Sequence, residues 1–503
     1  MFALAALAAA LCLEVAVGDC PSWGKPFPSN LAGLDKISYA DFFDVTYYDQ
    51  YKVLEYSPVL SMYSSTWHPD AALKGTSVPP IVLYQCGTTK PTTSSPGVPS
   101  NARFFEIPVK KATVGSSVPL PFMELLGVTQ SIDLLDISLT SSPCMQLMAQ
   151  CFPEMHIKTS NATWTARANQ TDLLFSDAFG AGYFGDAQKD VPFQISLDRG
   201  TLDRAEWVKF MALFYNEEEQ AEHIFEQVKA DYNALKTIGN QLRTDPSTQY
   251  NGEQPKAIFV TQWGGKNIIN NAIYKSRFID DAGAQVVSLP ATAPKNCTFA
   301  SNNDGSKTMS CDIGDGDAGF KSILAEADVI IDEFSLWPTH AASAYPGFGT
   351  VYNVTPQEVP ALARNPPNIF RVDGYISDPF EDGTVGMGWL DIQQSEPQQT
   401  LAGLMEAIWD ADFTSTCGQK YIRRASDNNA QQVVSHSDCP LVDSLGHCER
   451  IHGRARSPPM CSPGKVFEPF ETTTTTTGQV EASAACGVGM FVALMLGPFL
   501  SAF

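Results

Sequence analysis

The chain is short of basic residues. Its 503 residues include 33 Lys and Arg against 55 Asp and Glu, which gives a formal net charge of −22. Surfaces that bind nucleic acid or anionic lipid need clustered Lys and Arg side chains, so the composition argues against both kinds of partner. Charged residues of either sign are also few, at 17%, whereas 44% of residues are hydrophobic. That apolar content excludes a mainly disordered chain, and the length allows roughly two to four domains.

Motifs of the common enzyme classes are missing as well. The sequence has no G-x-x-x-x-G-K-[ST] phosphate loop, no zinc-binding H-E-x-x-H and no G-x-S-x-G nucleophile turn. The seven histidines are scattered without metal-ligand spacing. The acidic run 311–317 does not fit a calcium loop, because Cys311 and Ile313 would stand at ligand positions, so a solvated turn that caps a helix is preferred. We therefore predict no enzymatic activity, no intrinsic cofactor and no metal site.

The first segment predicts entry into the secretory pathway. Residues 1–18 are apolar apart from Glu14, and Ala16 and Gly18 supply the small residues of a signal-peptidase site. Cleavage would follow Gly18. The segment lacks the usual basic residue near Met1, and a buried N-terminal helix is the alternative interpretation.

The last segments predict attachment to the cell surface. Residues 471–485 contain a run of six threonines at 472–477 and read as an O-glycosylated stalk, and residues 486–503 are apolar or small to the last position. No basic residues follow, as they would after a spanning helix, so a GPI-attachment signal with its site near Ser483 is preferred to a single C-terminal transmembrane helix. Either anchor would hold the body of the protein outside the cell.

The cysteines fit an extracellular location. Two of the twelve, Cys12 and Cys486, lie in the end segments, and the remaining ten are an even number, as a set of disulfides requires. We predict that ten cysteines are bridged: Cys20, Cys86, Cys144, Cys151, Cys297, Cys311, Cys417, Cys439, Cys448 and Cys461.

Spacing suggests part of the disulfide pairing. The last four of these cysteines form a C-terminal group with three possible connectivities. Histidines lie among them, but no C-x-x-C pair is present, so disulfides are preferred to zinc. Outside that group, Cys144 and Cys151 bracket a short loop or turn, Cys297 and Cys311 bracket a Gly/Asn/Ser-rich one, and Cys20 and Cys86 are left for each other.

Predicted glycosylation also suits a secreted surface. An N-x-[ST] sequon accepts N-linked glycans where it is exposed. A proline directly after the last sequon weakens that one. The four sequons are at Asn161, Asn169, Asn296 and Asn353.

Residues 19–103 read as a β-rich extension. Segments 43–48 and 51–56 alternate apolar and polar residues on either side of a turn, which predicts a hairpin. Residues 81–84 form a further predicted strand, and the Pro/Ser/Thr-rich stretch 88–101 a loop.

From residue 104 to 200, short apolar strands alternate with helices. Strands are predicted at 111–114, 132–137 and 173–175, and a helix at 121–126. Continuous apolar strands are typical of a parallel sheet that is covered on both faces. We assign this region to a first lobe.

Residues 201–243 carry the strongest helical pattern. Trp207, Phe210 and Phe214 recur at helical spacing, which places them on one face, and core packing is the preferred interpretation of these aromatics. Asn216 followed by Glu219 resembles an N-cap and its capping box, which predicts a second, long helix from there.

Alternation resumes in the segment 255–413, which we assign to a second lobe. Strands are predicted at 256–261, 285–289 and 329–331. The predicted helices are 273–282, then 318–327 with Asp317 as its cap, and a region from 389 to 409 that is interrupted at Pro397. The predicted fold class is therefore α/β, with two Rossmann-like βα lobes joined by a long interlobe helix, an N-terminal β extension, and a disulfide-rich module at 414–470.

Several of these segments resemble one family. The family is that of the class III substrate-binding proteins of bacterial ABC transporters. Its opening hairpin is similar to residues 43–53, its first cleft loop and helix to 109–128, its backbone helix to 202–236, and its closing helices to 388–391 and 397–413. The resemblance extends over about residues 40–413 and is closest at 202–236. The C-terminal cysteines and the anchor lie outside the family pattern, which suggests a eukaryotic surface form.

The resemblance implies a largely pre-formed cleft between the lobes, with ligand loops at the carboxyl ends of the strands. Members of the family carry iron-siderophores, haem or cobalamin. Trp263 and Trp337 would stack on the ligand, although lobe packing explains them equally well. The implied ligand-binding residues are Ser116, Ser117, Phe179, Gln262, Trp263, Phe334 and Trp337.

The function predicted from these observations is non-catalytic capture of a metal chelate outside the cell, first of all an iron-siderophore, for uptake through a membrane transporter or reductase. No basic triad for an anionic catecholate is evident, which favours a neutral hydroxamate or a macrocycle. The alternative is an adhesion or structural surface protein that keeps the fold without a ligand.

Overall fold

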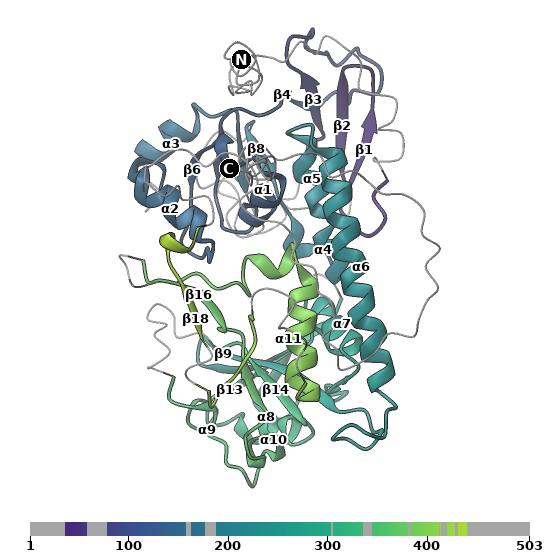
Figure 1. Ribbon diagram of the computed structural model, residues 1–503, viewed down its shortest axis with the longest axis vertical. Coiled ribbons are helices and arrows are strands. Elements are labelled where there is room, and N and C mark those ends of the chain that lie inside the picture. The colour runs from purple at the N-terminus through teal and green to yellow at the C-terminus, as the bar shows by residue number, and fades with distance from the viewer. Residues whose placement is uncertain are drawn as a thin grey trace, which may run out of the picture. The chain divides into compact units, whose positions relative to one another are not determined.

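A computed structural model gives the fold of the chain (Figure 1). The chain separates into two compact units, residues 1–464 and residues 465–503, and all the described residues belong to the first. The structure describes residues 36–57, 78–156, 162–176, 188–302, 305–334, 345–380, 383, 385–411, 413, 420–427 and 431–439. The predicted signal peptide, stalk and anchor signal lie outside the described residues, as do Cys20, Asn161, Phe179, Trp337, Cys417, Cys448 and Cys461.

A four-stranded sheet forms the N-terminal extension, in the order β1-β2-β3-β4. The predicted hairpin is confirmed, since β1 and β2 are antiparallel neighbours. β3 pairs with β2 in antiparallel and with β4 in parallel fashion. The strands are β1 (Phe43–Tyr47), β2 (Tyr51–Tyr56), β3 (Ile81–Gln85) and β4 (Arg103–Ile107).

The first lobe is built on a second sheet, in the order β6-β5-β7-β8. All its strands are parallel, and every residue in them except Asp133 is buried, as the continuous apolar runs predict. The strands are β5 (Ala112–Val114), β6 (Ile132–Leu135), β7 (Leu173–Ser176) and β8 (Asp190–Pro192). The helices of this lobe are α1 (Leu120–Leu126), α2 (Pro143–Cys151) and α3 (Ala162–Ala168).

Three helices follow, α4 (Thr201–Ala205), α5 (Trp207–Leu213) and the long α6 (Glu218–Leu242). The predicted N-cap is wrong by one residue, because α6 is capped at Glu217. Asn216 instead takes a left-handed conformation, with φ of 61°, which Asn tolerates better than most residues. Its Oδ1 accepts a hydrogen bond of 2.8 Å from the Nζ of Lys52 on β2.

The aromatic face of α5 is core, as predicted. The Trp207, Phe210 and Phe214 side chains are fully buried. The Phe43 ring of β1 lies 5.1 Å from the Trp207 ring and 5.2 Å from the Phe210 ring, and Phe193 lies 5.2 Å from Trp207. These edge-to-face contacts join the N-terminal sheet, the first lobe and the interlobe helices into one core.

The second lobe holds an eight-stranded sheet, in the order β12-β13-β10-β9-β14-β15-β17, with β11 also beside β9. β11, β9, β14 and β15 are parallel, and β10, β13 and β12 extend the sheet as antiparallel strands. Its strands are β9 (Lys256–Trp263), β10 (Lys266–Asn270), β11 (Gln285–Val286), β12 (Cys297–Ser301), β13 (Lys307–Asp312), β14 (Val329–Asp332), β15 (Ile369–Arg371) and β17 (Arg423–Arg424).

The helices of the second lobe return the chain to α6. Tyr232 of α6 donates a hydrogen bond of 2.8 Å to Asp281 of α7, and Figure 1 shows α7 and α11 beside the second half of α6. The helices are α7 (Ile273–Asp281), α8 (Asp317–Leu324), α9 (Phe348–Val351), α10 (Pro360–Ala363) and α11 (Pro397–Trp409). The α/β class with two βα lobes and a long interlobe helix is thereby confirmed.

The predicted helix cap at Asp317 needs a small correction. Gly316 is the N-cap, and Asp317 is the first residue of α8. The Asp317 carboxylate still closes the turn before the helix, because Oδ1 accepts from the backbone N–H of Gly314 at 3.0 Å.

The disulfides confirm one predicted pair and contradict another. Cys297 and Cys311 are bridged across the β12–β13 hairpin, as predicted. Cys144 bonds Cys439, so the Cys144–Cys151 pair is wrong, and Cys439 does not belong to a self-contained C-terminal group. The segment between Cys144 and Cys151 is helix α2, in which seven residues span about 10 Å, too far for a bridge. Cys86 and Cys151 are also in disulfides, and the Cys20–Cys86 pair stays a prediction.

Among the described residues, none of the helices combines the length and the apolar character that a membrane crossing requires.

Candidate functional site

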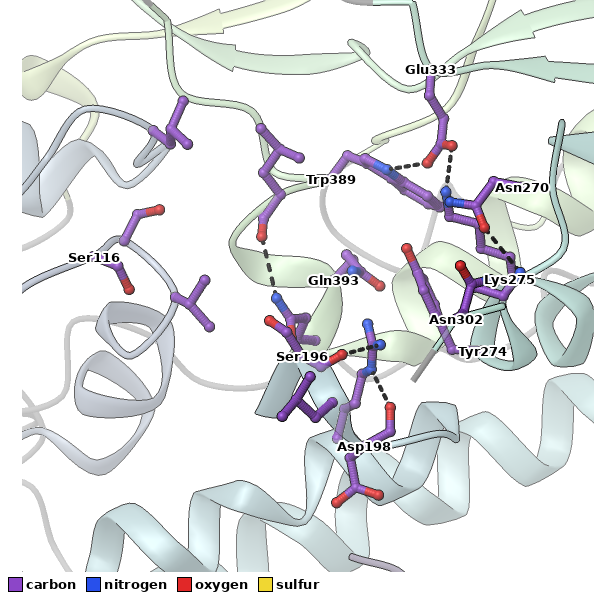
Figure 2. Close-up of a pocket in the computed structure, with 18 of the residues that line it drawn as sticks. Ser116, Ser196, Asp198, Asn270, Tyr274, Lys275, Asn302, Glu333, Trp389 and Gln393 are labelled. Carbon is purple, nitrogen blue, oxygen red and sulfur yellow. Dashed lines mark hydrogen bonds and ion pairs between the residues drawn. The ribbon is translucent and has the colours of Figure 1, made fainter. Parts of the chain in front are cut away.

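A cavity of about 890 Å³ lies between the two lobes (Figure 2). From the first lobe, its wall comes from the residues that follow the carboxyl ends of β5, β6 and β8. From the second lobe, it comes from the ends of β10, β12 and β14 and from the segment 389–394 before α11, which includes the short helix η7 (Ile392–Gln394). Loops at the carboxyl ends of parallel strands are where α/β folds commonly bind ligands.

Arg204 of α4 forms one charged part of the wall. Its Nε donates to the Asp198 carbonyl and its Nη2 to the Ser196 carbonyl, each at 2.9 Å. The guanidinium carbon lies 3.8 Å from the centre of the Tyr274 ring, at the start of α7. Tyr274 belongs to the second lobe, so this cation–π contact joins the lobes beside the cavity.

Lys275, Glu333 and Trp389 form the second charged part. The Lys275 ammonium contacts Glu333 Oε2, and Trp389 Nε1 donates to Glu333 Oε1 at 3.0 Å (Figure 2). The Trp389 ring stacks on Phe259 with centroids 5.6 Å apart. Burial acts to lower the pKa of Lys275, but the Glu333 carboxylate and the Tyr274 side chain together outweigh it and hold that pKa above its usual value. The amine therefore stays charged and paired.

The formal charge of the cavity wall is close to balanced. Its two cations, Arg204 and Lys275, both have partners, and its carboxylates are Asp136, Asp198 and Glu333. Between these groups lie neutral polar side chains, and one of them, the buried Ser116 hydroxyl, finds no hydrogen-bond partner within the described part of the chain. The other neutral polar residues of the wall are Ser117, Ser138, Ser196, Asn270, Ser301, Asn302, Gln393 and Gln394.

Of the predicted ligand residues in the described ranges, Ser116 and Ser117 line the cavity. Trp263 lies at the tip of the β9–β10 hairpin and is 68% exposed. Gln262 Nε2 donates to Asn267 Oδ1 and to the Val351 carbonyl, both at 2.9 Å.

Phe334 is partly buried against the core of the second lobe, with its ring 6.3 Å from Tyr345. Gln262, Trp263 and Phe334 are not in the described wall of the cavity. Ligand contact by any of the predicted residues stays a prediction.

Sequence reasoning missed Arg204, Tyr274, Lys275, Glu333 and Trp389 as cavity residues. Arg204 and Trp389 fall in segments that carry the family resemblance, but there they read as helix positions. Lys275 and Tyr274 stand in the first turn of α7, and only the packing of α7 against β9 and α4 brings them to Glu333 and Arg204.

A cluster of acidic groups adjoins the cavity. Asp41, Asp198 and Asp203 each place a carboxylate oxygen within 4.8 Å of the others, a spacing that could hold a cation. Arg199 already pairs with Asp41 at 2.9 Å, and Arg277 with Asp203 at 3.3 Å. These arginines neutralise part of the charge that a metal ion would need.

No known family profile matches the sequence, and no curated protein matches it. Solved structures do match the fold. A periplasmic haem-binding protein from Pseudomonas aeruginosa is 12% identical, with 60% of this chain and 94% of that chain covered and a TM-score of 0.39. An FhuD-fold component of a ferrichrome transporter from Bacillus subtilis is 14% identical, covering 60% and 95%, with a TM-score of 0.37. An Fe3+-hydroxamate transport protein from Saccharomonospora viridis is 12% identical, covering 60% and 94%, with a TM-score of 0.38.

Proposed function

We propose that this protein is a non-catalytic binding protein that captures a metal chelate in the cavity between its lobes. An iron-siderophore is the first candidate for that chelate. The observation that carries the proposal is the cavity itself. Its 890 Å³ volume fits the range of small-molecule sites, and both lobes contribute to its wall. The alternative, an adhesion protein with a dead cleft, would leave the cleft filled, and the open cavity favours binding over it.

The chemistry of the wall favours a chelate with little net charge. Arg204 and Lys275 are both engaged by protein groups, so a multiply anionic catecholate chelate would meet no free cation among the described residues of the wall. The wall instead offers hydroxyls and amides, such as Ser116 and Asn302, beside the aromatic rings of Tyr274 and Trp389. A neutral hydroxamate chelate or a macrocycle matches such a surface.

A ligand screen tests this function. The purified chain is titrated with a ferric hydroxamate, a ferric catecholate, haem and cobalamin, while tryptophan fluorescence and thermal unfolding are recorded. Saturable quenching by one neutral chelate, with a rise in Tm, is the expected result because a ligand of the native state stabilises it. Trp389→Phe should remove much of the quenching, and the matched control Trp263→Phe should not. Absence of binding across the whole panel would reject the proposal.

We further propose that the protein works at the cell surface and passes its ligand to a membrane transporter or reductase. The apolar end segments and the even number of cysteines support this location. The three sequon asparagines in the described ranges, Asn169, Asn296 and Asn353, are all exposed, as glycan acceptors need to be. Release of the protein from cells by phosphatidylinositol-specific phospholipase C tests the GPI anchor, and retention after treatment would favour a transmembrane helix.

A further inference from the structure

One disulfide joins the two lobes. Cys144 lies on α2 of the first lobe, and Cys439 lies 295 residues later in the chain. Cys439 follows β18 (Gln432–Val434), which pairs in parallel with β16 (Tyr375–Ser377). β16 comes directly after β15 of the second lobe, so this bridge is a covalent link between the lobes that is separate from the α4–α6 connection.

Each end of the bridge is fastened to its own lobe. The Val434 carbonyl accepts from Asp378 N–H, and the Gly374 carbonyl from Gln432 N–H, both at 2.7 Å. On the other side, the Ser142 hydroxyl caps α2 and also donates to the buried Glu124 of α1. A displacement of one lobe is therefore transmitted through the bridge to the other.

A buried polar contact lies beside this bridge. Asp391 of the second lobe is fully buried. Its carboxylate accepts from the Ser141 backbone N–H at 2.7 Å, from the Ser141 hydroxyl at 2.9 Å and from the Thr140 hydroxyl at 3.3 Å. Thr140 and Ser141 precede α2, only a few residues before Cys144. A buried carboxylate that satisfies three donors of the other lobe strongly favours this one arrangement.

The backbones of the two lobes also touch at this place. A Cβ atom added to Gly386 would lie 1.9 Å from the Thr140 carbonyl oxygen, so only glycine permits the approach. Gly386 N–H in turn is held by the Ser377 hydroxyl of β16 at 2.8 Å. The contact is therefore rigid on the side of the second lobe as well.

These contacts border the cavity. Ser138 and Leu139 line it immediately before Thr140, and residues on either side of Asp391, namely Trp389, Leu390, Gln393 and Gln394, line it from the second lobe. The lobes are thus held twice, by α4–α6 and by the contacts around Cys144–Cys439.

We propose that the Cys144–Cys439 bridge and Asp391 clamp the lobes together, so that the ligand enters and leaves a cavity of fixed width without an opening of the lobes. Cys144, Cys439 and Asp391 are positioning residues, which act on the ligand only by holding the segments 138–139 and 389–394 in register. The part of the inference that concerns a ligand rests on the proposed function, and the part that concerns the lobes does not.

The first test needs no ligand. Spin labels are introduced by non-canonical residues at two exposed positions of the full-length chain, Glu154 in the first lobe and Gln357 in the second. Electron–electron double resonance then measures the distance between the lobes. C144S/C439S should broaden the distribution towards longer distances, whereas the matched control C297S/C311S, which removes a bridge within one lobe, should not. An unchanged distribution in C144S/C439S would overturn the clamp.

Gly386→Ala gives an independent variant that keeps every disulfide, in case the double variant does not fold. The added methyl group must displace the Thr140 carbonyl, so the distance between the labels should lengthen. Gly403→Ala, where the added Cβ would meet Ile422 at an ordinary contact distance of 3.5 Å, serves as its control for a changed glycine. A Gly386→Ala distribution identical to that of the unmodified protein would contradict the inference.

The second test uses the chelate found in the ligand screen. Opening the clamp should raise Kd about two- to tenfold, because only part of the population would hold the cavity at binding width. The rate of chelate exchange should rise with it. If no chelate binds the unmodified protein, the proposed function fails while the distance measurement still decides the clamp. If the label distance changes while Kd and the exchange rate do not, the width that the clamp holds does not matter to the ligand, and the ligand part of the inference is wrong.

Discussion

Replacing Asp198 by Asn should stabilise the protein at neutral pH. The Asp198 side chain is 1% exposed and accepts hydrogen bonds from Trp207 Nε1 at 3.0 Å and from the Asp41 backbone N–H at 3.2 Å. Burial raises its pKa to about 6, and the carboxylates of Asp203 and Asp41 add to that effect. No cation pairs with Asp198 among the described ion pairs, so its negative charge in the folded protein is held at a cost.

The magnitude follows from the displacement of the pKa. An unfolded Asp titrates near 3.8, and a displacement to about 6 corresponds to about 3 kcal/mol at about 1.4 kcal/mol per pKa unit. Between these two pKa values the folded chain binds more protons than the unfolded chain. The free energy of unfolding therefore falls as pH rises from about 4 to about 6, by up to that amount. Asn keeps the Trp207 hydrogen bond through its Oδ1 without the charge, but its NH2 group cannot accept from the Arg199 backbone N–H, which Asp198 Oδ1 accepts at 3.1 Å, and this loss costs about 1 kcal/mol. The net gain expected for Asp198→Asn at pH 7.5 is about 2 kcal/mol.

Urea unfolding between pH 4 and pH 8, followed by tryptophan fluorescence, measures this difference. The Asp198→Asn variant should be more stable than the unmodified protein at pH 7.5, and the advantage should disappear towards pH 4. Asp49→Asn, which changes an exposed carboxylate, is the matched control. Parallel pH profiles for Asp198→Asn and the unmodified protein would refute the reasoning, because they would mean that Asp198 titrates alike in the folded and unfolded chains.

Two further substitutions test the core that holds the lobes. Lys52→Ala leaves the buried Glu218 without its ion-pair partner and should reduce the free energy of unfolding by about 3–5 kcal/mol. The double variant Lys52→Met with Glu218→Leu should recover most of that free energy. An equal loss in both variants would contradict the ion-pair argument. Phe210→Ala should reduce the free energy of unfolding in denaturant by about 3–5 kcal/mol, because the Phe210 ring fills the centre of the aromatic core. Trp263→Ala, at an exposed position, should change that free energy by no more than about 0.5 kcal/mol. A Phe210 variant as stable as the Trp263 variant would rule out that core.

The elements that the sequence predicted well are those with a local signal. The hairpin of β1 and β2 alternates apolar and polar residues over most of its length, β7 and β14 begin with continuous apolar runs, and α5 repeats its aromatics at helical spacing. Each of these patterns can be read within about ten consecutive residues, because the burial of an element determines which of its positions must be apolar.

The elements that the sequence did not predict lack a local hydrophobic pattern. β12 and β13 carry several Thr and Ser residues and no long apolar run, so no strand is predicted there, and they are held by each other, by β10 and by Cys297–Cys311. The mistaken Cys144–Cys151 pair has the same origin. Sequence proximity suggested a bridge, while the helix that forms between these residues keeps them apart and turns Cys144 towards Cys439.

The sequence by itself determined the α/β class, the two lobes, the long helix between them and the aromatic core, because hydrophobic periodicity is local and burial enforces it. Only the tertiary structure decided which residues line the cavity and which disulfide joins the lobes beside it. Arg204 and Tyr274, Lys275 and Glu333, and Cys144 and Cys439 are 58 or more residues apart in the chain. Such pairs meet because two sheets and α6 bring their loops together, and no local pattern encodes that distance.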